Sequence, residues 1–97
     1  EITGEKKAEI LLLDTGAVLN IQGIFVAIGM IPQTEAVKDL VALDESGYIK
    51  AGEDGITSEL GFFVAGDVRT KELRQIITAA ADGANAANSA IQYIIRK

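Results

Sequence analysis

Residues 57–76 read TSELGFFVAGDVRTKELRQI, and this stretch decides the fold. The short apolar run at residues 62–65 is typical of a buried strand, and the glycine after it lets the chain turn tightly. Asp67 then places a carboxylate at the end of the strand. A loop follows, and it leads into a helix whose first free N–H groups lie near Gln75 and Ile76. The stretch predicts a strand, a turn and a helix, as in an α/β fold.

The C-terminal part of the chain carries the clearest helical pattern. Apolar residues recur at helical spacing over residues 73–95, with alanines and Gly83 in the middle and isoleucines at both ends. A helix of this length is roughly 30 Å long. Small residues in the middle of the stripe let a second backbone or a flat ligand approach closely. We expect this stripe to serve mainly as core packing.

The segments before residue 57 favour β-structure. Residues 8–13 and 17–21 predict a hairpin, because Asp-Thr-Gly between them has the residues of a tight turn. Residues 24–28 form an apolar run between two glycines, which is typical of a strand covered on both faces. Residues 42–50 predict a second hairpin around a Glu-Ser-Gly turn. These elements, together with one long C-terminal helix, indicate the α/β class.

Two shorter signals lie between the hairpins. Ile31 precedes Pro32 and is therefore expected to be extended. Thr34 suits the N-cap of a short helix that continues to about Leu40, and Glu35 suits the positive end of that helix.

The composition excludes several classes of function. The chain has 97 residues, 48% of them hydrophobic and 24% charged, which is the composition of one globular domain. It has no Cys and no His, so thiolate chemistry, imidazole catalysis and typical zinc sites are excluded from it. The net charge of −5 argues against nucleic-acid or acidic-membrane binding, and no apolar run approaches a membrane span. We expect an intracellular domain with no catalytic and no metal-binding residue of its own.

The predicted turn and helix start have the chemistry of a ligand site. Ligands in open α/β sheets bind beyond the carboxyl ends of the strands, and a helix N-terminus offers unpaired N–H donors. Asp67 repels a phosphate but accepts hydrogen bonds from a hydroxyl, so a polyol joined to an electron-rich ring would suit both groups. Two simpler interpretations stand beside this one: Asp67 caps a turn, and Arg74 pairs with Glu72 or Asp67.

Several short pieces, taken in order and spacing, resemble the C-terminal portion of the thioredoxin reductase family, the two-domain flavoprotein disulfide reductases. The resemblance covers nearly the whole chain in one register. The matching pieces are residues 23–29 with Pro32 and Thr34, residues 47–49, Thr57 and Ser58, residues 61–67, Arg74 and Gln75, and residues 78–80 with Gly83.

The resemblance implies an incomplete FAD/NAD(P)-binding, Rossmann-like fold. Residues 1–31 would end an NADPH-binding domain, and residues 32–97 would form the C-terminal half of an FAD-binding domain. In such proteins the aspartate of the Ala-Gly-Asp turn bonds hydroxyls of the flavin's ribityl chain, and the start of the last helix faces the flavin ring. The cofactor-binding residues that the resemblance implies are Gly66, Asp67, Val68, Arg74, Gln75 and Ile76.

The resemblance also implies an activity for the longer protein of which this segment would be a part, called the parent protein below. It would be a cytoplasmic, homodimeric reductase with FAD and NADPH as cofactors, and it would pass electrons to a thioredoxin-like protein. The family's Gly-rich fingerprints and its Cys-x-x-Cys are absent from these 97 residues, so we expect the segment alone to be inactive. Two alternatives remain: a ferredoxin/flavodoxin–NADP reductase of the same fold without the Cys pair, and a non-catalytic fragment that dimerises through its apolar stripe.

Overall fold

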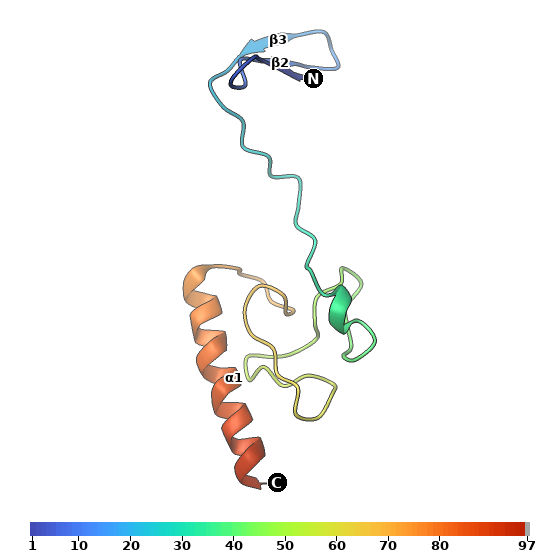
Figure 1. The fold of residues 1–97 in the computed structure, drawn as a ribbon, viewed down its shortest axis with the longest axis vertical. Coiled ribbons are helices and arrows are strands. Elements are labelled where there is room, and N and C mark those ends of the chain that lie inside the picture. The colour runs from blue at the N-terminus through green and yellow to red at the C-terminus, as the bar shows by residue number, and fades with distance from the viewer. Residues whose placement is uncertain (97) are drawn as a thin grey trace.

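The computed structural model describes residues 1–96, which form two parts joined by an extended segment (Figure 1). At the N-terminal end lie three strands, β1 (Ile2–Thr3), β2 (Ile10–Leu12) and β3 (Val18–Asn20). The second part holds the 3-10 helix η1 (Glu35–Val37) and the helix α1 (Ile76–Arg96). The radius of gyration is 20.0 Å, against about 13 Å for a compact domain of this length. The chain is therefore not one compact body.

The three strands form an antiparallel sheet in the order β1-β2-β3. Ile10 pairs with Asn20 and Leu12 with Val18, and the N–H of Leu13 donates to the carbonyl of Ala17 at 2.9 Å. The hairpin predicted from residues 8–21 is confirmed, with shorter strands than expected. β1 was not predicted, because two residues carry no readable alternation.

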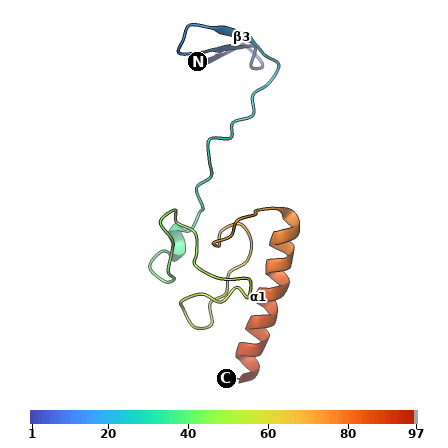
Figure 2. The ribbon, with the colours of Figure 1, turned by 180° about the vertical axis from the view of Figure 1, so that it is seen from behind.

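The segment at residues 22–31 is extended but unpaired. Figure 2, the view from behind, shows the same open path between the sheet and the second part of the chain. The prediction that residues 24–28 form a strand covered on both faces is wrong for this chain: Phe25 is fully exposed and Ile28 is 95% exposed. An apolar run becomes a buried strand only where neighbouring strands accept its hydrogen bonds, and residues 1–96 provide no such neighbour.

Single backbone bridges organise the second part of the chain. Leu43 and Ile49 form an antiparallel bridge, which confirms the hairpin predicted at residues 42–50. Ile49 also bridges Arg69 in parallel, and its N–H donates to the carbonyl of Val68 at 2.8 Å. The predicted strand at residues 62–65 is reduced to one bridge between Ile56 and Phe63.

The short helix predicted from Thr34 to Leu40 is shorter and tighter than expected. Only η1 forms, and Thr34 makes no side-chain cap to it. The Thr34 hydroxyl instead donates to the carbonyl of Gly47 at 2.6 Å, so it ties η1 to the adjacent hairpin. The contact turns the Thr34 side chain toward the hairpin, and its oxygen accepts no N–H from η1.

The hydrophobic core is small. Val41, Ile49 and Val64 are buried together. The partly buried side chains packed against them are Val37, Leu43, Ala51, Phe62 and Val68. The chain exposes 7639 Å² of surface, whereas a compact protein of its mass exposes about 5,300 Å². Much apolar surface is therefore left open.

Helix α1 begins three residues later than the apolar stripe suggested, and its buried residues lie in its middle. Asp82 and Ala86 are its buried residues, and its isoleucines are exposed at both ends. The expectation that the stripe serves mainly as core packing is wrong for its two ends. The small-residue interpretation is confirmed at Ala86, which the backbone of Gly55 approaches closely, while Gly83 faces open space. Within residues 1–96, no helix combines the length and apolarity needed to cross a bilayer.

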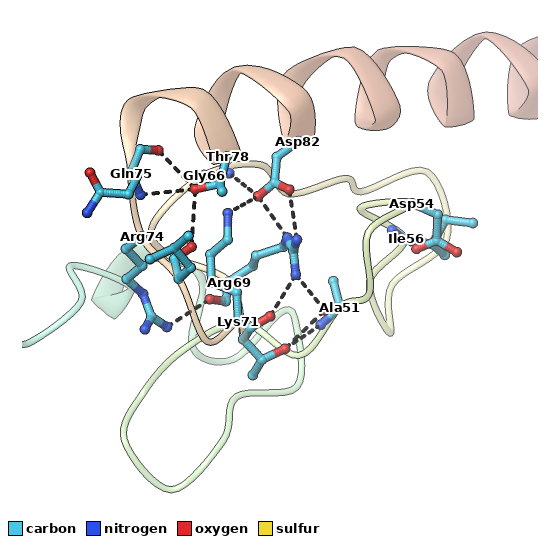
Figure 3. A network of polar contacts seen from close by, with 12 residues as sticks. Ala51, Asp54, Ile56, Gly66, Arg69, Lys71, Arg74, Gln75, Thr78 and Asp82 are labelled. Atoms are coloured by element: carbon cyan, nitrogen blue, oxygen red, sulfur yellow. Dashed lines mark hydrogen bonds and ion pairs between the residues drawn. The ribbon is translucent and has the colours of Figure 1, made fainter.

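A buried polar cluster joins α1 to the loops (Figure 3). Both carboxylate oxygens of Asp82 are bound by Arg69, through Nε at 2.8 Å and Nη2 at 2.7 Å. Lys71 Nζ donates to Asp82 at 2.7 Å, and the N–H of Gly66 donates to it at 2.9 Å. Asp82 is 4% exposed and Arg69 is 6% exposed. These four hydrogen bonds fix α1 against residues 66–71.

The hydrogen bonds from Arg69 hold the pKa of Asp82 far below its ordinary value, although burial opposes this shift. Lys71 and the N–H of Gly66 lower the pKa of Asp82 further. The same contact with Asp82 raises the pKa of Arg69. A carboxyl with a lowered folded-state pKa stabilises the fold above its unfolded-state pKa, and this stabilisation is lost as the pH falls through the range between the two values.

We predict that folding depends on the charge of Asp82. Asp82→Asn leaves Arg69 and Lys71 buried without a counterion and should cost about 3–5 kcal/mol of stability. In the unsubstituted chain, acid should weaken the packing of α1 once the pH falls below about 4, the ordinary pKa of an aspartate. Circular dichroism during denaturant titrations at several pH values measures both effects. Asp39→Asn, at an exposed position, is the matched control, and its stability should depend on pH as that of the unsubstituted chain does.

We also predict that replacing Gly55 lowers the stability of the fold more than replacing Gly47 does. A Cβ at Gly55 would lie 2.5 Å from the Val64 carbonyl oxygen and 2.9 Å from Ala86 Cβ, at a φ of +68°. Gly47 has a φ of +89°, but its nearest neighbour would be Pro32 Cγ at 3.5 Å. Gly47→Ala should therefore cost about 1 kcal/mol for its φ alone, and Gly55→Ala about 1–3 kcal/mol more for the overlap. Equal losses in denaturant melts of the two variants would contradict the close approach.

Candidate functional site

The turn at Gly66 and Asp67 lies beside the first two turns of α1. Gly66 adopts a φ of +85°, and a Cβ placed there would be 3.8 Å from Ala79 Cβ. Its N–H is held by Asp82, one turn further along the helix (Figure 3). The positive φ permits the sharp change of direction after residue 65. The turn and the start of the helix, which the sequence placed in one site, are brought together by the structure.

The start of α1 leaves backbone donors free. Gln75 precedes the helix, and its carbonyl accepts the first helical hydrogen bond, from the N–H of Ala79 at 3.0 Å. The N–H of Gln75 donates to the Thr78 hydroxyl at 3.0 Å. Within residues 1–96 the N–H groups of Ile76, Ile77 and Thr78 have no hydrogen-bond partner. Together with the helix dipole, these donors favour an electron-rich or anionic group.

The Asp67 side chain is exposed and makes no hydrogen bond or ion pair with another described residue. Only its backbone is fixed, because the Asp67 carbonyl accepts a hydrogen bond from Arg74 Nε at 2.9 Å. The interpretation of Asp67 as a turn cap is therefore not supported by its contacts. The carboxylate is available to accept hydrogen bonds from a hydroxyl.

Arg74 makes different contacts from those considered for it. Neither Glu72 nor the Asp67 carboxylate pairs with it; its guanidinium binds the carbonyls of Asp67 and Arg69 and lies over the ring of Tyr48. Val68 packs against the core, and its carbonyl accepts the N–H of Ile49.

Sequence reasoning missed the role of Asp82. The cations Arg69, Lys71 and Arg74 stand out in an acidic chain, and Asp82 is the one acid within α1. An acid one helical turn before the buried Ala86, on the same face, is the signal that could have identified it. Among the described residues, no group of acidic side chains is arranged to hold a metal ion.

The free groups define what the site can hold. The Asp67 carboxylate accepts hydrogen bonds, and the free N–H groups at the start of α1 donate them. A ligand with hydroxyls next to an electron-rich ring edge fits both, whereas a phosphate beside Asp67 meets like charge. The residues therefore fit the ribityl chain and ring edge of a flavin.

Three comparisons place the chain among known proteins. The family model for pyridine nucleotide-disulphide oxidoreductases matches residues 1–83. The chain is 49% identical to a thioredoxin reductase of Peptoclostridium acidaminophilum over 72 residues, covering 74% of this chain and 23% of that protein. It is 39% identical to a thioredoxin reductase of Listeria innocua over 95 residues, covering 94% of this chain and 30% of that protein.

Solved structures agree with these relatives. The crystal structure of thioredoxin reductase from Streptococcus pyogenes matches with a TM-score of 0.79 and 40% identity, covering 100% of this chain and 34% of that one. The thioredoxin reductase of T. acidophilum matches with a TM-score of 0.80 and 38% identity, covering 97% of this chain and 33% of that one. The chain thus spans a quarter to a third of the length of these relatives.

The α/β, Rossmann-like class and the resemblance inferred from the sequence are confirmed by these matches. The chain belongs to the pyridine nucleotide-disulphide oxidoreductase family.

Proposed function

We propose that this chain is part of an FAD- and NADPH-dependent thioredoxin-disulfide reductase and that it supplies one wall of the FAD site. The observation that carries the proposal is that the Asp67 turn lies beside the first turns of α1, while the Asp67 carboxylate and the first N–H groups of α1 have no partner within residues 1–96. Support comes from relatives and structures named thioredoxin reductase, which match up to the full length of this chain.

The chain's own residues would bind and orient the cofactor. Asp67 would accept hydrogen bonds from ribityl hydroxyls, while the turn at Gly66 and Val68 would allow the backbone to approach closely. The free N–H group of Ile76 would face the electron-rich edge of the ring, and Gln75, whose own N–H is held by the Thr78 hydroxyl, would set the start of the helix beside it. A helix end of this kind stabilises a negative charge by about 0.3–1 kcal/mol, or up to about 2 kcal/mol where partly buried. When bound, FAD supplies the transfer of electrons from NADPH to a disulfide.

The same proposal extends to domains and partners. Residues 1–31 would end the NADPH-binding domain, and residues 32–97 would form the C-terminal half of the FAD-binding domain. The parent protein would act in the cytoplasm as a homodimer, with a thioredoxin-like protein as its electron acceptor. The exposed isoleucines of α1 and the unpaired segment at residues 22–31 support contact with further protein chain, from the rest of the parent protein or from a second subunit, because such apolar surface is normally covered.

We predict that the 97-residue chain does not retain FAD. One wall of a site, without the Gly-rich phosphate-binding loops of the family, offers too few contacts to offset the cost of ordering a dinucleotide. The purified chain is mixed with FAD and desalted, and flavin absorbance and fluorescence are followed. Stoichiometric flavin in the protein fraction would contradict this prediction.

We predict that Asp67→Ala weakens FAD binding in the whole flavoprotein. Leaving the flavin hydroxyls without their acceptor should cost about 1–3 kcal/mol of binding free energy, which is a Kd about 5 to 150 times higher. Fluorescence titration of the apoprotein with FAD measures the change. Glu72→Ala, which removes an exposed acid from the same loop, is the matched control and should bind FAD normally. An unchanged Kd for Asp67→Ala would remove Asp67 from the site.

A further inference from the structure

We propose that Tyr48 and Arg74 form a positioning pair, which sets the backbone at Asp67 and so directs its carboxylate toward the flavin. This inference rests on the proposed function, because it concerns the same site. It assigns a role to Tyr48, a residue outside the predicted cofactor-binding set. It also assigns Arg74 a role that acts through the backbone of the site.

Arg74 closes the loop that leads from the Asp67 turn to α1. Its Nε donates to the carbonyl of Asp67 at 2.9 Å, and its Nη2 donates to the carbonyl of Arg69 at 3.1 Å. Figure 3 shows the Arg74 side chain reaching back from the start of the helix to the backbone beside Arg69. The planar guanidinium thus spans two carbonyls at once, a geometry that a lysine cannot reproduce.

Tyr48 provides the surface on which the guanidinium rests. Arg74 Cζ lies 3.8 Å from the centroid of the Tyr48 ring, which is a cation–π contact. Tyr48 is itself fixed by its backbone: its N–H donates to Asp44 Oδ1 at 2.9 Å, and its carbonyl accepts the N–H of Asp44 at 2.8 Å. The next residue, Ile49, bonds to the carbonyl of Val68. The backbone that carries the ring is therefore held at a set position relative to the Asp67 turn.

The two contacts together restrict Asp67 without occupying its carboxylate. The Asp67 carbonyl is directed at Arg74, so the peptide plane that follows Asp67 is fixed. Arg74 makes no ion pair with the Asp67 side chain, which stays free for a ligand. Misplacing a binding group by a small distance weakens an interaction strongly. Loss of the Tyr48 face should therefore reduce flavin binding although Tyr48 need not touch the flavin.

The test uses the whole flavoprotein, with Tyr48→Leu, Tyr48→Phe and Arg74→Lys. Tyr48→Leu and Arg74→Lys should raise the FAD Kd by about threefold to thirtyfold, the equivalent of one cation–π contact, and should alter the visible circular dichroism of the flavin. Tyr48→Phe keeps the ring face and should restore both readouts. The unfolding midpoint of each apoprotein is measured in parallel, because a purely structural role would lower that midpoint and leave the flavin spectrum unchanged.

A double variant shows whether Tyr48 acts through Asp67. If it does, Tyr48→Leu combined with Asp67→Ala should bind FAD about as weakly as Asp67→Ala alone, because positioning an absent carboxylate gains nothing. Additive losses of FAD affinity would overturn the inference. An unchanged Kd and spectrum for Tyr48→Leu would also overturn it. So would a Tyr48→Phe variant that binds FAD as weakly as Tyr48→Leu. If Asp67→Ala itself binds FAD normally, the proposed function fails at this site. If only the Tyr48 and Arg74 variants bind normally, the positioning pair alone fails.

Discussion

The buried carboxylate of Asp82 is the constraint on which the second part of the chain depends. It receives four hydrogen bonds, two from Arg69, one from Lys71 and one from the N–H of Gly66. Few apolar side chains are buried, so packing alone does not explain how α1 is held against the loops. A buried charge is costly unless every partner is in place, and it therefore specifies one arrangement of these elements. Because Gly66 is one of the partners, the arrangement fixes the Asp67 turn as well.

Local patterns in the sequence predicted the elements whose partners lie nearby in the chain. The structure confirms two hairpins, at residues 8–21 and 42–50, and the long helix. Turn residues and helical spacing act over a few residues, so the sequence shows them directly. The apolar runs at residues 24–28 and 62–65 were expected to be strands and are not regular strands here. A strand depends on neighbours that are distant in sequence, and periodicity does not show whether the chain supplies them.

The candidate site divides in the same way. Gly66, Asp67 and the start of the helix were predicted from the order of strand, glycine, acid and helix, and the structure brings them together. Their cofactor contacts remain a proposal. The groups that hold them were not predicted: Asp82 lies 15 residues beyond Asp67 in the chain, and Tyr48 lies 19 residues before it. Such supporting contacts depend on tertiary folding, and the sequence marks them only by an acid on the inner face of a helix and an aromatic residue in a hairpin.

In this chain the buried polar side chains are paired, whereas many large apolar side chains are exposed. This contrast bears on the proposed function. Among the described residues, no buried polar side-chain atom lacks a hydrogen-bond partner, so the loops around α1 are internally complete. The isoleucines at both ends of α1 and the run at residues 24–28 are exposed. Apolar surface of this extent is typical of an interface, and the free carboxylate and N–H groups of the candidate site lie on the same helix and the turn beside it. One wall of a ligand site, with its supports built in and its opposite wall supplied by other chain, would have this combination.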